Sequence, residues 1–196
     1  MKLIITESPA KAKKIQGFLG KDYIVKSSVG HIRGLDTKWA NTEININREF
    51  EPPFVVLKDK RDVIQSLKSS SKNNEVILAA DDDREGEAIA WHCGIVLNVD
   101  FNNFNRIKYR EISKKAIVNA LKNPLKVDLN EVNAQKARSV IDLLIGYKLS
   151  PCLWKHIDTN VKGLSAGRVQ SALLNLLYEH DKKIKEFEPE YYYEIL

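Results

Sequence analysis

An unbroken apolar run from Val76 to Ala80 limits the possible folds of this chain more than any other feature. It lies within the segment 75–80, EVILAA, between a polar stretch and an acidic one. A strand that is apolar at every position is typical of the centre of a parallel sheet, where both faces of the strand are buried. The run therefore predicts a parallel sheet that is covered by helices on both faces.

Strand and helix patterns alternate on either side of this run. Apolar and β-branched segments predict further strands at 2–6, 22–27 and 106–109. Helical spacing predicts helices at 9–19, 61–68, 85–97 and 113–122, with Ser113 as an N-cap. The stretch 36–60 is poorly periodic and predicts a loop. This order of elements indicates an α/β fold, a Rossmann-like, doubly wound parallel sheet with helices on both faces.

The pattern changes after residue 123. Residues 130–149 and 167–185 predict two long helices, and the alternating residues at the end of the chain predict a strand that has just begun. We therefore expect an α/β domain at 1–123, part of a mainly α-helical domain at 124–187, and the truncated start of a following domain at 188–196.

Composition excludes few functions. Hydrophobic residues make up 43% of the chain, which is enough for a sizeable core, and the net charge of +5 allows binding to a polyanion without demonstrating it. Cys93 and Cys152 form no CxxC metal pattern, so a reduced intracellular protein is the simpler interpretation. Because no apolar segment is long enough for a signal peptide or a membrane span, we expect a cytoplasmic protein without a membrane partner.

An acidic run follows the apolar strand directly and contains Asp81, Asp83 and Glu85 at alternate positions. Ligands of open α/β sheets bind beyond the carboxyl ends of the strands, and Glu7, which ends the first strand, would reach the same edge. Crowded carboxylates repel unless a proton or a cation neutralises them, and hard oxygen ligands suit Mg²⁺. The alternative is a solvated acidic turn at a helix N-terminus, where acidic residues are stabilised anyway. The buried-type strand before the run and the nearby Glu7 favour the metal site.

Lysines follow Glu7 at the start of the first helix. Lys11 lies in the first helical turn, where backbone N–H groups and the helix dipole favour a phosphate. Lys13 and Lys14 are better explained as a solvated helix face.

Several blocks of the chain, in this order, resemble the bacterial topoisomerase I branch of the type IA DNA topoisomerases. They are Glu7–Ala12, Ser28–Arg33, Asp81–His92, Asn133–Arg138, Gly146–Pro151 and Gly163–Ser171. The acidic segment alone is similar to the toprim signature, which primases and some nucleases share. The blocks after residue 130 distinguish a topoisomerase from those enzymes.

The resemblance implies a reaction that relaxes negatively supercoiled DNA. A tyrosine cuts one strand, a second strand passes through the gap, and the covalent phosphotyrosine allows religation without a nucleotide cofactor. By motif, Glu7 would handle the proton of the 3′-oxygen and Lys11 would stabilise charge on the scissile phosphate. Asp81, Asp83 and Glu85, with Glu7 close by, would hold Mg²⁺, and Arg84 would balance their charge.

The family's tyrosine lies in a later domain, and none of the seven tyrosines here has its sequence context. We therefore expect this chain to bind Mg²⁺ and single-stranded DNA as a monomer but not to cleave DNA. The tyrosine would come from the rest of the topoisomerase chain.

The second part of the chain would contribute a groove for single-stranded DNA. Arg138, Ser139 and Asp142 recur at helical spacing, and Asp142 is placed to pair with Arg138. Residues 165–170 form a small-residue loop that enters a helix and can approach a phosphate. The expected DNA contacts are His31, Arg138, Ser139, Val140, Asp142, Leu143, Lys148, Lys155, Ser165, Ala166, Gly167, Arg168, Val169 and Gln170.

Alternatives stay open at several of these positions. Core packing is a competitive explanation for Val140 and Leu143, and a structural hydrogen bond is an equal one for His31. The segment 158–162 looks a few residues longer than the family's usual loop. For the whole chain, the alternatives are a primase or nuclease with the same kind of metal site and a non-enzymatic metal- or DNA-binding module.

Overall fold

The computed structural model describes residues 1–36, 52–157 and 163–195. The chain divides into two compact units, Met1–Val140 and Ile141–Leu196. Most of the loop expected at 36–60, and the segment 158–162, lie outside the described residues.

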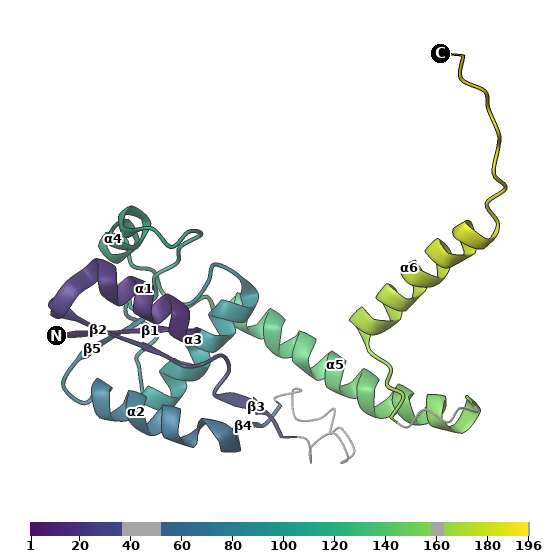
Figure 1. Ribbon diagram of the computed structural model, residues 1–196. Coiled ribbons are helices and arrows are strands. Elements are labelled where there is room, and N and C mark those ends of the chain that lie inside the picture. Colours follow the sequence, from purple (N-terminus) through teal and green to yellow (C-terminus); the bar gives the residue numbers. More distant parts are fainter. Residues whose placement is uncertain (37–51, 158–162, 196) are drawn as a thin grey trace. The chain divides into compact units, whose positions relative to one another are not determined.

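A three-stranded parallel sheet forms the centre of the first unit (Figure 1). Its strands are β1 (Lys2–Thr6), β2 (Tyr23–Ser27) and β5 (Glu75–Leu78), in the order β2-β1-β5. In the central strand, Ile4 pairs with Val25 on one side and with Ile77 on the other. The predicted parallel sheet is confirmed, and all its strands end at one edge.

The expected strand at 106–109 is reduced to single bridges. Arg106 pairs in parallel with Leu78 of β5 and antiparallel with Leu125, and neither pairing extends further. The Arg106 side chain turns back and bonds to backbone carbonyls around the end of β5, including those of Ala80 and Asp81. The segment therefore continues the sheet for one residue and then serves the turn beyond it.

Helices cover both faces of the sheet (Figure 1). Leu3 and Ile5 of β1 pack with α2 (Arg61–Ser71) and α3 (Arg84–Leu97), whereas Ile4 packs with α1 (Pro9–Leu19) and α4 (Lys114–Lys122). Side chains alternate across a strand, so one apolar strand supplies both layers. This arrangement confirms the expected Rossmann-like α/β fold.

Side-chain caps determine where three of these helices begin. Ser8 accepts a hydrogen bond from Lys11 N, Asp83 from Gly86 N and Ser113 from Ala116 N. The cap at Ser113 was predicted. The caps at Ser8 and Asp83 place Lys11 and the acidic run at the same edge of the sheet.

A short antiparallel pair was not predicted. It consists of β3 (Arg33–Leu35) and β4 (Phe54–Val56). Each strand has only three residues, which is too short for a periodic pattern, and the sequence between them has no hairpin signature. The sequence therefore did not predict them.

Two helices dominate the rest of the chain. The 28-residue helix α5 (Leu129–His156) begins in the first unit and continues into the second, and α6 is Arg168–Lys185. The expected end of α5 at residue 149 was wrong, because the helix continues through Pro151. The strand expected at the end of the chain is absent from the described residues 188–195, where Tyr191–Tyr193 are exposed without a partner strand. No helix in the described ranges is long and apolar enough to cross a membrane.

Candidate metal and nucleic-acid site

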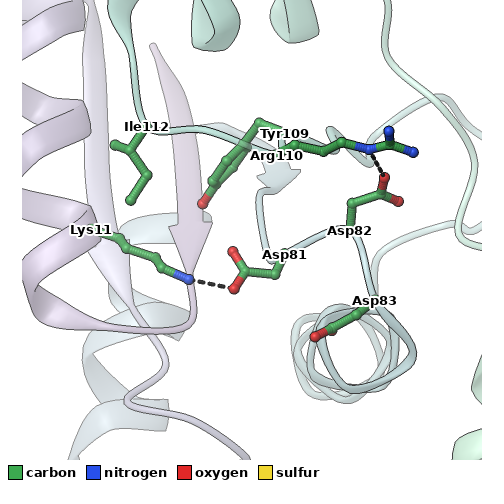
Figure 2. Close-up of a pocket in the computed structure, with 7 residues that line it drawn as sticks. All are labelled: Lys11, Asp81, Asp82, Asp83, Tyr109, Arg110 and Ile112. Carbon is green, nitrogen blue, oxygen red and sulfur yellow. Dashed lines mark hydrogen bonds and ion pairs between the residues drawn. The ribbon is translucent and has the colours of Figure 1, made fainter. Parts of the chain in front are cut away.

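An open pocket of about 560 Å³ lies where β5 turns into α3 (Figure 2). Its lining consists of Lys11, Asp81, Asp82, Asp83, Tyr109, Arg110 and Ile112. The turn is tight because Gly86 lies against its backbone: a Cβ at Gly86 would be 2.8 Å from Asp81 N. Glycine is therefore required at this position for the acidic residues to keep their places.

Lys11 joins two carboxylates that are far apart in the sequence. Its ammonium lies 2.5 Å from Asp81 Oδ2 and also bonds to Glu7 Oε1 (Figure 2 shows the Asp81 contact). The side chains of Lys11 and Glu7 are about one-fifth exposed. The three residues thus form a partly buried cluster at the end of β1, where sequence analysis expected a metal ligand and a phosphate-binding lysine.

The pKa values of the two carboxyls in this cluster are shifted in opposite directions. Burial raises the pKa of Glu7, Lys11 lowers it, and neighbouring Asp81 adds to the rise, so that the net shift is upward. For Asp81, burial acts upward, but hydrogen bonds from Lys11 and Glu7 lower the pKa below its ordinary value. Burial lowers the pKa of Lys11, but its bonds to Asp81 and Glu7 outweigh this and raise it. A proton that enters the cluster therefore resides on Glu7.

The other expected metal ligands turn away from Lys11. Asp83 uses Oδ1 to cap α3 by accepting from Gly86 N at 2.6 Å. Glu85 bonds through Oε1 to His31 Nε2 at 2.5 Å and through Oε2 to Gln135 Nε2 at 3.2 Å. Within the described ranges, no group of three carboxylates, imidazoles or thiols is close enough to hold a metal ion.

His31 therefore contacts one of the expected metal ligands. Its bond and Gln135 lower the pKa of Glu85 although burial acts in the opposite direction. The bond from Gln135 to Glu85 links α5 to α3, and Gln135 also donates to Ser139 Oγ of its own helix at 3.0 Å. Gln135 was not among the predicted site residues, although it lies inside the Asn133–Arg138 block.

A buried ion pair supports the turn from below. Arg106 and Glu87 are both fully buried and meet through Nε and Oε2 at 3.0 Å. The Arg106 guanidinium donates to the carbonyls of Ala80 at 2.7 Å and Asp81 at 2.6 Å, and Glu87 Oε1 accepts from Asp128 N at 2.8 Å. The sequence pattern predicts Arg84 as the cation that balances the acidic run. Arg84 is the exposed first residue of α3 and has no ion-pair partner in the part of the chain described here.

Tyr109 is the tyrosine nearest the pocket, but its hydroxyl is already used. It donates to Ala79 O at 2.8 Å, and burial, with Asp81 nearby, raises its pKa to about 12. A buried phenol with so high a pKa is a poor nucleophile.

In the second unit, Arg168 and Asp142 form a two-pronged ion pair, with Arg168 Nε and Nη2 lying 2.5 and 3.1 Å from the Asp142 carboxylate oxygens. The pairing of Asp142 with Arg138 that the sequence pattern suggests stays a prediction. The loop before α6 is held by α5, because Ser150 Oγ accepts from Ala166 N at 3.1 Å and Trp154 donates to Leu164 O at 2.5 Å.

The remaining expected DNA contacts differ in exposure. The exposed ones are Arg138, Lys148, Lys155, Ser165, Val169 and Gln170. The half-buried ones are Val140, Leu143 and Gly167. Ser165 Oγ bonds to Gln170 Oε1 at 3.0 Å, which ties the loop to the first turn of α6. Their contacts to DNA stay predictions.

Comparisons with known proteins match the chain over consecutive ranges. Residues 2–127 match the toprim domain family, and residues 126–196 match a DNA topoisomerase family. The structure of full-length topoisomerase I from Thermotoga maritima is similar, with 44% sequence identity and a TM-score of 0.82. The similarity covers 96% of this chain and 32% of the Thermotoga chain, so this chain spans about a third of the length of that relative.

Proposed function

Because this chain belongs to the DNA topoisomerase I family and carries a toprim domain, we propose that it supplies the phosphate- and metal-binding half of a type IA active site. The whole protein would cut one strand of DNA, pass another strand through the gap and religate the first. Negatively supercoiled DNA would be its substrate. Religation would need no ATP, because a phosphotyrosine bond conserves the energy of the broken phosphodiester.

The directions of the pKa shifts of Glu7 and Lys11 support roles for both residues in this reaction. A carboxyl with a raised pKa can donate a proton to a 3′-oxygen as it leaves and accept the proton back on religation. Lys11 stays charged and lies beside Glu7, where it can stabilise negative charge on the reacting phosphate. The shared ammonium contact keeps the two residues within reach of one phosphate.

The acidic residues fit a magnesium ion by the chemistry of their donors. Asp81, Asp83, Glu85 and Glu7 offer carboxylate oxygens, which Mg²⁺ prefers, and all four follow strand ends or begin α3 at one edge of the sheet. When bound, the ion would neutralise charge on the DNA phosphate. Asp81 would exchange its contact with Lys11 for the ion, and Glu85 would exchange its contact with His31.

The nucleophile would come from outside this site. Tyr109 is committed to the Ala79 carbonyl, and Tyr191–Tyr193 lie in an exposed stretch without regular structure. We therefore propose that this chain binds DNA but does not cut it, and that a tyrosine elsewhere in the topoisomerase completes the site. Single-stranded DNA would contact Arg168 and the loop before α6.

The observation that carries the proposal is the Glu7–Lys11–Asp81 cluster in a toprim domain. The test compares the full-length gene product with this chain alone. We expect the full-length protein to relax negatively supercoiled DNA with Mg²⁺ and without ATP, and to lose relaxation in Glu7→Gln and Lys11→Met. This chain alone should bind single-stranded oligonucleotides without cleaving them. Nucleotide polymerisation, or relaxation that requires ATP, would contradict the proposal.

A further inference from the structure

A row of cations runs along the segment 106–110, beside the acidic turn. Every second side chain, Arg106, Lys108 and Arg110, pairs with an acidic residue of the turn or of α3. The relative exposure of these side chains rises from 0% to 21% to 90% along the row. Ile107 and Tyr109 between them are buried in the core, as expected for an extended segment with alternating faces.

The two inner cations of the row are already occupied by the protein. Arg106 is saturated by Glu87 and by backbone carbonyls. Lys108 lies 3.1 Å from Glu87 Oε2 and 3.6 Å from Asp82 Oδ1. Their charges are therefore already balanced by acidic side chains of the protein, and their contacts neutralise the buried carboxylate and hold the turn.

The outermost cation is arranged differently. Arg110 contacts Asp82 only through Nε, which lies 3.3 Å from Oδ2, and the contact fixes the inner edge of the guanidinium (Figure 2). Its terminal amino groups Nη1 and Nη2 have no protein partner among the residues that the structure describes. Arg110 lines the same pocket as Lys11.

We propose that Arg110, oriented by Asp82, is a second phosphate-binding residue of this pocket and holds a phosphate of the DNA strand beside the one at Lys11. The inference rests on the proposed function. The guanidinium fork matches two phosphate oxygens, and a contact through Nε leaves the Nη1–Nη2 edge available for that pairing. Asp82 thereby acts as a positioning residue, and its charge is balanced by Lys108 and Arg110 and does not add to the metal site.

The fold does not depend on this contact. An ion pair whose arginine is 90% exposed contributes little to stability, so Arg110 can be replaced without unfolding the chain. Arg61, the exposed first residue of α2, offers a matched control because it lines a different pocket. Arg110→Gln and Arg61→Gln change the net charge equally and differ only in place.

The test measures binding of a fluorescent single-stranded oligonucleotide to the 196-residue chain across a salt series. We expect Arg110→Gln to weaken binding about 3- to 10-fold at low salt and to reduce the slope of log K against log salt by about 0.7. Arg61→Gln should change affinity less than about twofold, as expected for a charge outside the contact. Arg110→Lys should fall between Arg110→Gln and the unchanged chain, because it keeps the charge and loses the fork.

Equal effects of Arg110→Gln and Arg61→Gln would overturn the inference and leave the proposed function intact. A chain that binds no single-stranded DNA at all would overturn both.

The role of Asp82 has its own test. Asp82→Asn removes a repulsive charge, and if Asp82 also orients Arg110, the gain in affinity must be larger in the Arg110→Gln background than in the unchanged chain. Equal gains in both backgrounds would contradict the positioning role.

Discussion

Lys11 and Asp81 are 70 residues apart in the sequence, and their side chains meet with Nζ 2.5 Å from Oδ2. The contact joins the first turn of α1 to the turn between β5 and α3, and the same ammonium also holds Glu7. One cation therefore keeps two carboxylates together at the edge of the sheet. The stability of variants at these three residues therefore tests most directly how the site is held together.

Lys11→Met should destabilise the chain by about 1–2 kcal/mol at pH 7, because it leaves Glu7 and Asp81 facing each other without a cation. Without Lys11, the folded pKa of the pair rises above its unfolded value, so the lost stability should return as the pH falls through the folded pKa. Urea denaturation at pH 7, 6 and 5 measures this trend. Lys14→Met, at an exposed position of the same helix, is the control and should be nearly neutral. If the loss of stability in Lys11→Met did not change with pH, repulsion between Glu7 and Asp81 could not be its cause.

Unlike Lys11→Met, Glu7→Gln should not destabilise the chain at pH 7. The folded pKa of Glu7 is raised, mainly by burial, so its protonated form is favoured in the folded state and stability falls as the pH rises through that pKa. At pH 7, Glu7→Gln should match or exceed the stability of the unchanged chain, and the difference should vanish below about pH 4, where Glu7 is protonated in both states. Thermal unfolding at both pH values measures the difference. A clear loss of stability at pH 7 would show that the bond to Lys11 dominates Glu7.

The double substitution Asp81→Ala with Asp83→Ala should abolish Mg²⁺ binding in calorimetric titrations, since it removes two of the four carboxylates proposed to hold the ion. The control is Asp59→Ala with Asp62→Ala, which removes the same charge at the start of α2. Magnesium affinity should be unchanged in that control. Identical titrations of the unchanged chain and the Asp81/Asp83 variant would rule out this metal site.

Arg106→Met should cost about 3–5 kcal/mol of stability, because it leaves Glu87 buried with only Lys108 as a charge partner and removes the bonds to the turn carbonyls. In the double variant with Glu87→Gln, the amide can still accept from Asp128 N, and most of the loss should be recovered. Chemical denaturation of the two variants measures the difference. If the double variant is no more stable than the single one, the bonds from Arg106 to the turn carbonyls matter more than the charge of Glu87.

Local patterns predicted the sheet and its helices well, because each depended on neighbouring residues. The apolar segment 75–80 gave the strand β5, although β1 and not β5 lies at the centre of the three-stranded sheet, and Ser113 gave a helix start through its own hydroxyl. The acidic run could be assigned to the carboxyl edge because parallel strands end together. Glu7 and Lys11 were assigned to the same edge for the same reason.

Long-range pairing could not be predicted in this way. In the sequence, Arg106 resembles an ordinary exposed residue of a strand. In the structure it is fully buried, because it pairs with the buried carboxylate of Glu87, 19 residues earlier. The strand expected at 188–196 needs a partner, and its described residues 188–195 have none here, so alternation alone did not produce a strand. The pairing of Asp142 with Arg168, 26 residues later, joins two helices and has no local signature in the sequence.

The pairing of Arg168 with Asp142 affects how this part of the chain would bind DNA. Arg168 is held by Asp142 through two hydrogen bonds, which fix its guanidinium at the start of α6 and raise its pKa. We expect Arg168→Ala to weaken binding of single-stranded oligonucleotides and to make the salt dependence shallower by about 0.7 in the log–log slope, as for one lost phosphate contact. Lys182→Ala, near the other end of α6, is the matched control because it removes one exposed charge from the same helix. Asp142→Asn should loosen Arg168 without removing its charge, so affinity should fall while the salt slope stays the same. If Arg168→Ala and Lys182→Ala had equal effects, Arg168 would contribute only general positive charge, and the ion pair with Asp142 would serve the loop alone.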